Sequence, residues 1–152
     1  RTYILHLIQP FFTNKTKELV KNPEIFLVDS GLCNMLTQNF SLQTGTPVFG
    51  QIAENFAFTE LFKQNNPQIQ INFWRTKQKQ EVDIVLRKEN ELIPIEIKSG
   101  DAQTIPNGLR SFIRDYHPRV AFILNWSHIK DMEYDGCSVR FRPLWWTENV
   151  LS

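Results

Sequence analysis

Acidic, basic and apolar residues alternate in two segments that lie close together in the sequence. Asp83 lies in the first segment, and Glu96 and Lys98 lie in the second. Such alternation is typical of β-strands, in which successive side chains point to opposite faces of a sheet. The stretch from Glu81 to Lys98 therefore predicts a hairpin with Asp83, Glu96 and Lys98 on one face and its isoleucines in a core.

The short connection between these strands determines which residues face each other. If the turn is centred between Glu89 and Asn90, paired residues have numbers that sum to 179. Asp83 then faces Glu96 at a non-hydrogen-bonded position, where facing side chains approach most closely. The sequence thus predicts two carboxylates in close contact across the hairpin.

Two facing carboxylates repel each other and destabilise a sheet unless their charge is compensated. A divalent cation with oxygen ligands compensates it, and Lys98 on the same face would complete a site of a metal ion and an ammonium group. The alternative is an exposed strand pair in which Glu81 faces Lys98 and forms an ion pair with it. The pattern alone leaves both interpretations open.

The elements around the hairpin follow a simple order. Apolar residues with helical spacing predict a helix over 49–63. A strand over 69–74 precedes the hairpin, and a second helix ending before Pro118 and a buried strand over 120–124 follow it. Residues 139–146 are predicted to add an edge strand or a closing segment.

Glu60 lies within the apolar arc of the first helix. A buried carboxylate needs polar partners, so Glu60 is either functional or paired with a structural donor. Arg75, next to the acidic hairpin, has two similar interpretations: contact with a phosphate, or an ion pair with Glu81.

The first 44 residues differ from the remainder of the chain. Short apolar runs at 3–8 and 25–28 and a helix capped by Asp29-Ser30 predict the remnant of a preceding small α/β or winged-helix-like module. Residues 45–152 then form the main domain.

Composition limits the class of protein. The chain has 152 residues, 41% of them hydrophobic, and a net charge of +1, which indicates a globular domain without a general attraction to nucleic acid. Cys33 and Cys137 match no zinc-binding spacing and are expected to be free thiols. No apolar run reaches the length of a membrane-spanning helix, so we expect a cytoplasmic protein with no membrane contact.

From residue 49 the predicted order is helix, three strands, helix and strand, and in this order the chain resembles the PD-(D/E)xK nuclease superfamily. The segment 50–54 opens the first helix with glycine and ends on Glu54, as in archaeal Holliday junction resolvases. Asp83 supplies the aspartate of the motif, and Glu96 and Lys98 supply its last part. The proline that precedes the aspartate in the superfamily is Val82 here.

A closer resemblance is to an uncharacterised domain family that follows an AAA+ ATPase domain. Five ordered pieces carry this resemblance: 29–32, 50–54, 74–76, 81–83 and 95–100. The chain contains no Gly-x-x-x-x-Gly-Lys-Ser/Thr motif, so it is not expected to bind a nucleotide itself.

The resemblance implies a restriction-endonuclease-like αβββαβ core, with a mixed sheet flanked by helices. It implies a metal-dependent DNA phosphodiester hydrolase that works with an AAA+ ATPase domain of the same full-length protein. Asp83, Glu96 and Glu54 would bind Mg²⁺ or Mn²⁺, and Lys98 would orient or activate water. The rival interpretation is a non-catalytic module of the same fold that binds DNA or a protein partner. The choice between Glu54 and Glu60, the nucleic acid preferred and the oligomeric state stay open.

Overall fold

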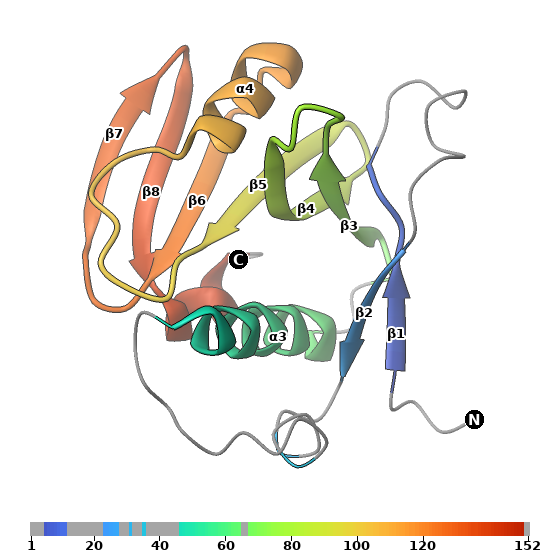
Figure 1. Cartoon of the computed structure of the whole chain (residues 1–152). Coiled ribbons are helices and arrows are strands. Elements are labelled where there is room, and N and C mark those ends of the chain that lie inside the picture. Colours follow the sequence, from blue (N-terminus) through green and yellow to red (C-terminus); the bar gives the residue numbers. More distant parts are fainter. Residues whose placement is uncertain are drawn as a thin grey trace.

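The computed structural model describes residues 5–11, 23–27, 31, 35, 46–64 and 67–150. Its centre is a mixed six-stranded sheet with the strand order β3-β4-β5-β6-β8-β7 (Figure 1). The strands are β3 Ile69–Arg75, β4 Glu81–Lys88, β5 Glu91–Ile97, β6 Val120–Asn125, β7 Lys130–Tyr134 and β8 Cys137–Pro143. The helices are α3 Pro47–Lys63, α4 Asn107–Tyr116 and the 3₁₀ helix η1 Leu144–Asn149. The protein is therefore a mixed α/β domain.

The sheet is buried on both faces by separate apolar clusters. On one face Phe58 of α3 packs in a cluster with Ile84 and Ile95. On the other face Phe112 of α4 packs in a cluster with Val85. Because both faces are covered, a polar side chain on either face near the middle of the sheet is drawn out of water.

The β4–β5 hairpin has the predicted register. Ile84 faces Ile95, and the same pairing continues to Lys88 and Glu91 around a turn at residues 89–90. Glu89 in this turn has a φ of 53°, a left-handed conformation suited to a tight two-residue hairpin. The prediction that numbers of paired residues sum to 179 is confirmed for the five pairs from Ile84 to Lys88. The observed pairing ends at Ile84 and does not include the predicted pair of Asp83 and Glu96.

The regular alternation predicted for β4 fails at its first residues. The pairing of β3 with β4 shifts between Asn72, which faces Val85, and Trp74, which faces Val82. One extra residue of β4 is accommodated there as a bulge, so Val82 joins Val85 in the cluster under α4 instead of lying with Ile84. Val82 and Ile84 therefore lie on opposite faces, although the alternation predicted for this hairpin would place residues two apart on the same face, and the bulge contains the position of Asp83.

The C-terminal part of the sheet also differs from the prediction. The predicted edge strand corresponds to β8, which lies inside the sheet, parallel to β6. β7 forms the edge instead, paired antiparallel with β8. Its sequence from Lys130 to Tyr134 is mostly exposed and polar, which is why an apolar pattern did not mark it.

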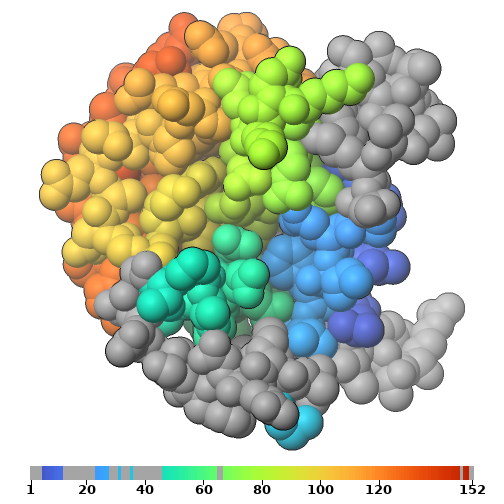
Figure 2. Space-filling view, in the orientation of Figure 1, coloured from blue at the N-terminus to red at the C-terminus, as the bar shows by residue number. Residues whose placement is uncertain are grey.

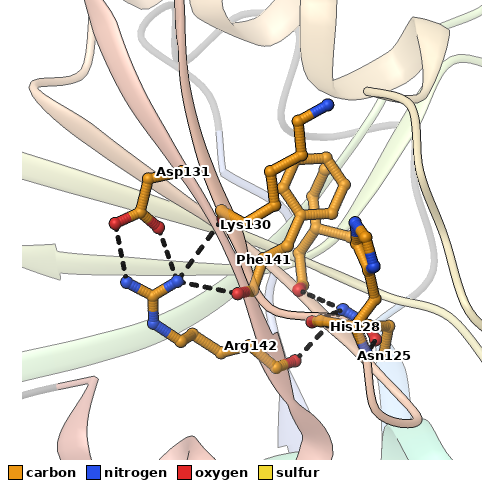
Figure 3. A network of polar contacts seen from close by, with 7 residues as sticks. Asn125, His128, Lys130, Asp131, Phe141 and Arg142 are labelled. Atoms are coloured by element: carbon orange, nitrogen blue, oxygen red, sulfur yellow. Dashed lines mark hydrogen bonds and ion pairs between the residues drawn. The ribbon is translucent and has the colours of Figure 1, made fainter.

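A buried asparagine fixes the loop that follows β6 (Figure 3). The Nδ2 of Asn125 donates hydrogen bonds to the carbonyl oxygens of Ile123, His128 and Arg142, and its Oδ1 accepts one from the backbone N–H of His128. Arg142 in turn binds the carboxylate of Asp131 on β7. These contacts connect the carboxyl ends of the neighbouring strands β6 and β8, and β6 in turn pairs with β5.

A two-stranded sheet of β1 Leu5–Ile8 and β2 Glu24–Leu27 packs beside this core. Asn55 of α3 holds it, because the side-chain amide exchanges two hydrogen bonds of 2.9 Å with the backbone N–H and C=O of Leu27. Figure 2 shows β2, in lighter blue, between α3 and the green strands of the sheet. The proposed boundary between residues 44 and 45 stays a prediction, and the helix predicted after Asp29-Ser30 lies largely outside the described residues.

The first turn of α4 packs tightly against β4 at Gly108. A Cβ added to Gly108 would lie 2.9 Å from the backbone nitrogen of Glu81 and closer still to its carbonyl oxygen. We expect Gly108→Ala to lower the free energy of unfolding by about 1–3 kcal/mol, although alanine is normally the better helix former.

Urea denaturation of Gly108→Ala measures this effect. Gly100→Ala is the matched control, because a Cβ there has no heavy atom within 4 Å. A Gly108→Ala protein as stable as the wild type would show that α4 does not approach β4 this closely.

None of the described helices is both long enough and apolar enough to cross a membrane.

Candidate functional site

The structure brings three of the predicted site residues together on β4 and at the end of β5. The Nζ of Lys98 lies 2.7 Å from the Oε1 of Glu96. Asp83 reaches across from β4, and its Oδ2 accepts a hydrogen bond of 2.6 Å from the backbone N–H of Ile97, the residue between Glu96 and Lys98. The two carboxylates and the ammonium group thus gather around one short stretch of β5.

Glu81 takes no part in the ion pair considered in the alternative interpretation of the hairpin. Its Oε2 lies 2.9 Å from the Nε of Arg75, and Lys98 is paired with Glu96 instead. Of the two interpretations given for Arg75, the ion pair with Glu81 is therefore present.

Glu96 is buried to an extent that is unusual for a carboxylate. Only 3% of the residue is exposed, and its Oε2 has no hydrogen-bond partner among the described residues. A buried charged oxygen without a partner costs several kcal/mol, so such groups normally bind a proton, a water or a metal ion. Among the described residues, the Oε2 of Glu96 is the carboxylate oxygen that is both buried and without a hydrogen-bond partner.

The electrostatics of the cluster follow from burial and from mutual repulsion. Burial raises the pKa of both Asp83 and Glu96 above the ordinary carboxyl range, and the charge of Asp83 raises the pKa of Glu96 further. Burial lowers the pKa of Lys98, but the adjacent Glu96 carboxylate more than compensates and leaves it raised. The pair of acids therefore favours a state with fewer negative charges or with an added cation.

Glu54, the third predicted metal ligand, comes from the second turn of α3. Burial and the nearby Asp83 carboxylate raise its pKa from 4.5 to about 7. Glu60 lies one and a half turns further on, and its carboxylate forms an ion pair of 2.7 Å with Lys63. Glu60 is therefore tied to a structural donor, and Glu54 is the helix carboxylate that faces the cluster.

A cavity of about 540 Å³ opens beside these residues, between α3, β2 and the β3–β4 pair. Glu54 and Asp83 line it, together with Glu81, Glu24 and Arg75. A separate cavity of about 310 Å³ near His6 is lined mainly by apolar side chains and contains none of the predicted site residues. Of these two cavities, the acidic one is lined by predicted site residues, Glu54 and Asp83.

The donor set suits a metal ion that keeps part of its water shell. Within the described ranges, no three His, Cys, Asp or Glu side chains are close enough to form a closed metal site. Mg²⁺, however, is commonly bound through one or two carboxylates, with water and substrate phosphate as the other ligands. Asp83 and Glu96, with the unpaired Oε2, fit that kind of site.

Sequence reasoning missed Glu24. This residue lies on β2, in the segment predicted to be a separate module, and its Oε1 is 3.0 Å from the Nη2 of Arg75. Burial raises its pKa, while Arg75 opposes the increase. Nothing in the local sequence marks Glu24, because its place in the cavity depends on how β2 docks onto α3.

The metal-free protein is expected to lose stability as the pH rises from about 4.5 to about 7. Glu54 has a higher pKa in the folded protein than in the unfolded chain, so in this range the folded state holds a proton that the unfolded state has released. Such a group stabilises the fold fully below its unfolded pKa, and the contribution disappears above its folded pKa. Asp83 and Glu96, whose pKa values are also raised, act in the same direction.

Denaturant unfolding in EDTA at a series of pH values measures this dependence. Glu54→Gln should make the curve flatter, and Glu60→Gln, which changes a carboxylate on the same helix outside the cluster, should leave it unchanged apart from the loss of an exposed ion pair. Stability that increases over the same pH range would contradict the described burial of these acids.

Comparison with known proteins places the chain among domains of unknown function. The sequence model of the family described as "Domain of unknown function (DUF4143)" matches residues 49–140. Uncharacterised proteins of Mycobacterium tuberculosis and Mycobacterium bovis are each 26% identical to the chain over 129 residues. That match covers 82% of this chain but only 29% of each relative. No solved structure matches the chain significantly.

Proposed function

The chain belongs to the DUF4143 family, and we propose that its domain is a metal-dependent nuclease with a restriction-endonuclease-like core. The order α3, β3, β4, β5, α4, β6 agrees with the αβββαβ order of that core. The observation that carries the proposal is the buried Asp83–Glu96 pair, with one unpaired carboxylate oxygen beside Lys98. A structural role alone gives no reason to bury two acids together.

The bound cation, Mg²⁺ or Mn²⁺, would supply a lowered pKa for the attacking water and charge stabilisation for the phosphate. Asp83 and Glu96 would hold it. Asp83 is already oriented, because the backbone N–H of Ile97 donates to one of its oxygens and leaves the other for a ligand.

Lys98 is proposed to orient the attacking water and to stabilise negative charge on the phosphate as the P–O bond breaks. Its Nζ is anchored by Glu96 and its side chain is 41% exposed, so it is both positioned and accessible. Glu54, with a pKa of about 7, would complete the site from α3 by binding a water of the metal or by exchanging a proton near neutral pH.

DNA is the proposed substrate, and an AAA+ ATPase domain of the same full-length protein is the proposed partner. Two observations support the ATPase partner. One is the sequence resemblance, and the other is that the match covers only 29% of each mycobacterial relative, so those proteins contain further sequence. A cytoplasmic location is also part of the proposal.

A non-catalytic module that binds DNA or a protein partner is the second candidate. The observation that favours it is the absence, among described residues, of three metal-binding side chains in one cluster. In this interpretation Lys98 neutralises Glu96, and Asp83 accepts a hydrogen bond from the backbone N–H of Ile97. No metal ion is then needed.

Cleavage of duplex, single-stranded and branched DNA with Mg²⁺, with Mn²⁺ and with EDTA separates the two candidates. The nuclease should cut at least one of these substrates only with metal. Arg119→Ala should cut equally well, because this side chain is 91% exposed and is not among the residues that line the cavity. Retarded DNA without cleavage under every condition would favour the binding module.

A further inference from the structure

Arg75 is the only cation among the residues that line the acidic cavity in the described part of the chain. Four carboxylates share that lining: Glu24, Glu54, Glu81 and Asp83. A phosphodiester is itself an anion, so this cavity would repel it unless positive charge is placed where the phosphate enters. The metal ion proposed at Asp83 and Glu96 would supply part of that positive charge, and the guanidinium of Arg75 would supply the rest.

The guanidinium of Arg75 is held from two sides. Its Nε lies 2.9 Å from Glu81 at the start of β4, and its Nη2 lies 3.0 Å from Glu24 on β2. The arginine comes from the end of β3, so three strands determine where its planar group points. A guanidinium oriented in this way loses little further freedom when it binds a phosphate.

Accessibility supports a role in binding. The Arg75 side chain is 45% exposed although both its carboxylate partners are in place. Arginine binds phosphate with two parallel hydrogen bonds, and arginine clamps are a common means of stabilising charge on a transferring phosphate.

We propose that Arg75 is a phosphate-binding residue of the nuclease site and that Glu24 and Glu81 are positioning residues that orient its guanidinium. The proposal rests on the proposed function and adds to it a residue of the substrate-binding surface. It also gives the β1–β2 segment, which lies outside residues matched by the family model, a role in the site. The structural alternative is an ion-pair cluster that only docks β2 onto the sheet.

The salt dependence of DNA binding distinguishes these alternatives. Each phosphate contact made by a cation releases counterions, so the slope of log K against log salt falls by about 0.7–0.9 when one contact is lost. Arg75→Ala should lower the slope by this amount. Arg75→Gln, which removes the charge but keeps a hydrogen-bond donor, should lower it equally, and Arg75→Lys should keep it.

The measurement uses fluorescently labelled duplex and single-stranded DNA with Ca²⁺ in place of Mg²⁺, at several salt concentrations. Arg119→Ala is the matched control, because its ion pair with Glu91 at 3.6 Å is also exposed. Melting temperatures show whether each variant is folded, and exposed ion pairs of this kind contribute little to them.

The proposal is overturned if both charge-removing variants keep the wild-type slope, or if the wild type binds neither DNA. Its failure is separable from failure of the nuclease proposal. Metal-dependent cleavage with an unchanged Arg75→Ala slope rejects only the role of Arg75. A lowered slope without cleavage by the wild type supports Arg75 as a phosphate ligand and rejects the nuclease.

Discussion

Replacing Lys98 with alanine is expected to slow metal-dependent DNA cleavage by about 10²–10⁴-fold, the usual contribution of a positioned catalytic group. Lys98 is half-exposed and is not an obligatory metal ligand. Its loss should leave the fold intact, because a metal ion, or a proton on Glu96 with its raised pKa, can neutralise the carboxylate in place of the ammonium group. Metal affinity should be unchanged or higher, because the variant lacks an ammonium group beside Glu96. Single-turnover cleavage and calorimetric titration with Mn²⁺ measure the two effects separately.

Two variants make this result specific. Lys63→Ala breaks an ion pair of the same length, 2.7 Å, with Glu60 on α3 and should cleave like the wild type. Glu96→Ala should lose both cleavage and metal binding, since it removes the carboxylate with the unpaired oxygen. Equal cleavage by the wild type and Lys98→Ala, prepared identically, would show that the activity belongs to a contaminant or to another site.

Asp83→Asn is expected to have opposite effects with and without metal. In EDTA at pH 8 the variant should be more stable than the wild type by roughly 1–2 kcal/mol, because one member of a buried repelling pair becomes neutral while its oxygen can still accept from Ile97. With metal at 100 times its dissociation constant the wild type should gain about 2.7 kcal/mol, and the variant should gain almost nothing.

Thermal and urea unfolding with EDTA and with Mg²⁺ measure both effects. Asp131→Asn is the control, because this carboxylate pairs with Arg142 on the opposite edge of the sheet and its pKa is lowered, mainly by that hydrogen bond. A wild-type protein whose stability is insensitive to millimolar Mg²⁺ and Mn²⁺, together with an Asp83→Asn variant that is less stable in EDTA, would exclude a repelling pair at this position.

The hairpin could be predicted from sequence because its information is local. Alternation determines the faces of a strand, and a two-residue turn at Glu89 and Asn90 determines the register, so the proximity of β4 to β5 followed directly. The bulge in β4 could not be predicted in the same way. It arises from the fit between β3 and β4, and it moves Val82 to the other face without any signal from glycine or proline.

The buried face of α3 could not be predicted from the sequence, for a different reason. The buried positions of α3 include Asn55 and Thr59, whose side chains bind the backbone of Leu27 on β2. An arc drawn through apolar residues alone therefore misplaces the buried face, and this made Glu60 look more enclosed than it is. Only the docking of β2 reveals both this face and the entry of Glu24 into the cavity.

The central claim is that Asp83 and Glu96 bind one catalytic cation between them. Crystals soaked in Mn²⁺, or grown with Mn²⁺ and a short DNA that cannot be cleaved, test it through the anomalous signal of manganese. We expect one anomalous peak in contact with the Oε2 of Glu96 and with a carboxylate oxygen of Asp83, and no peak there in Asp83→Asn crystals. DNA-bound crystals that lack this peak, or in which Glu96 Oε2 is bound only by water, would contradict the claim.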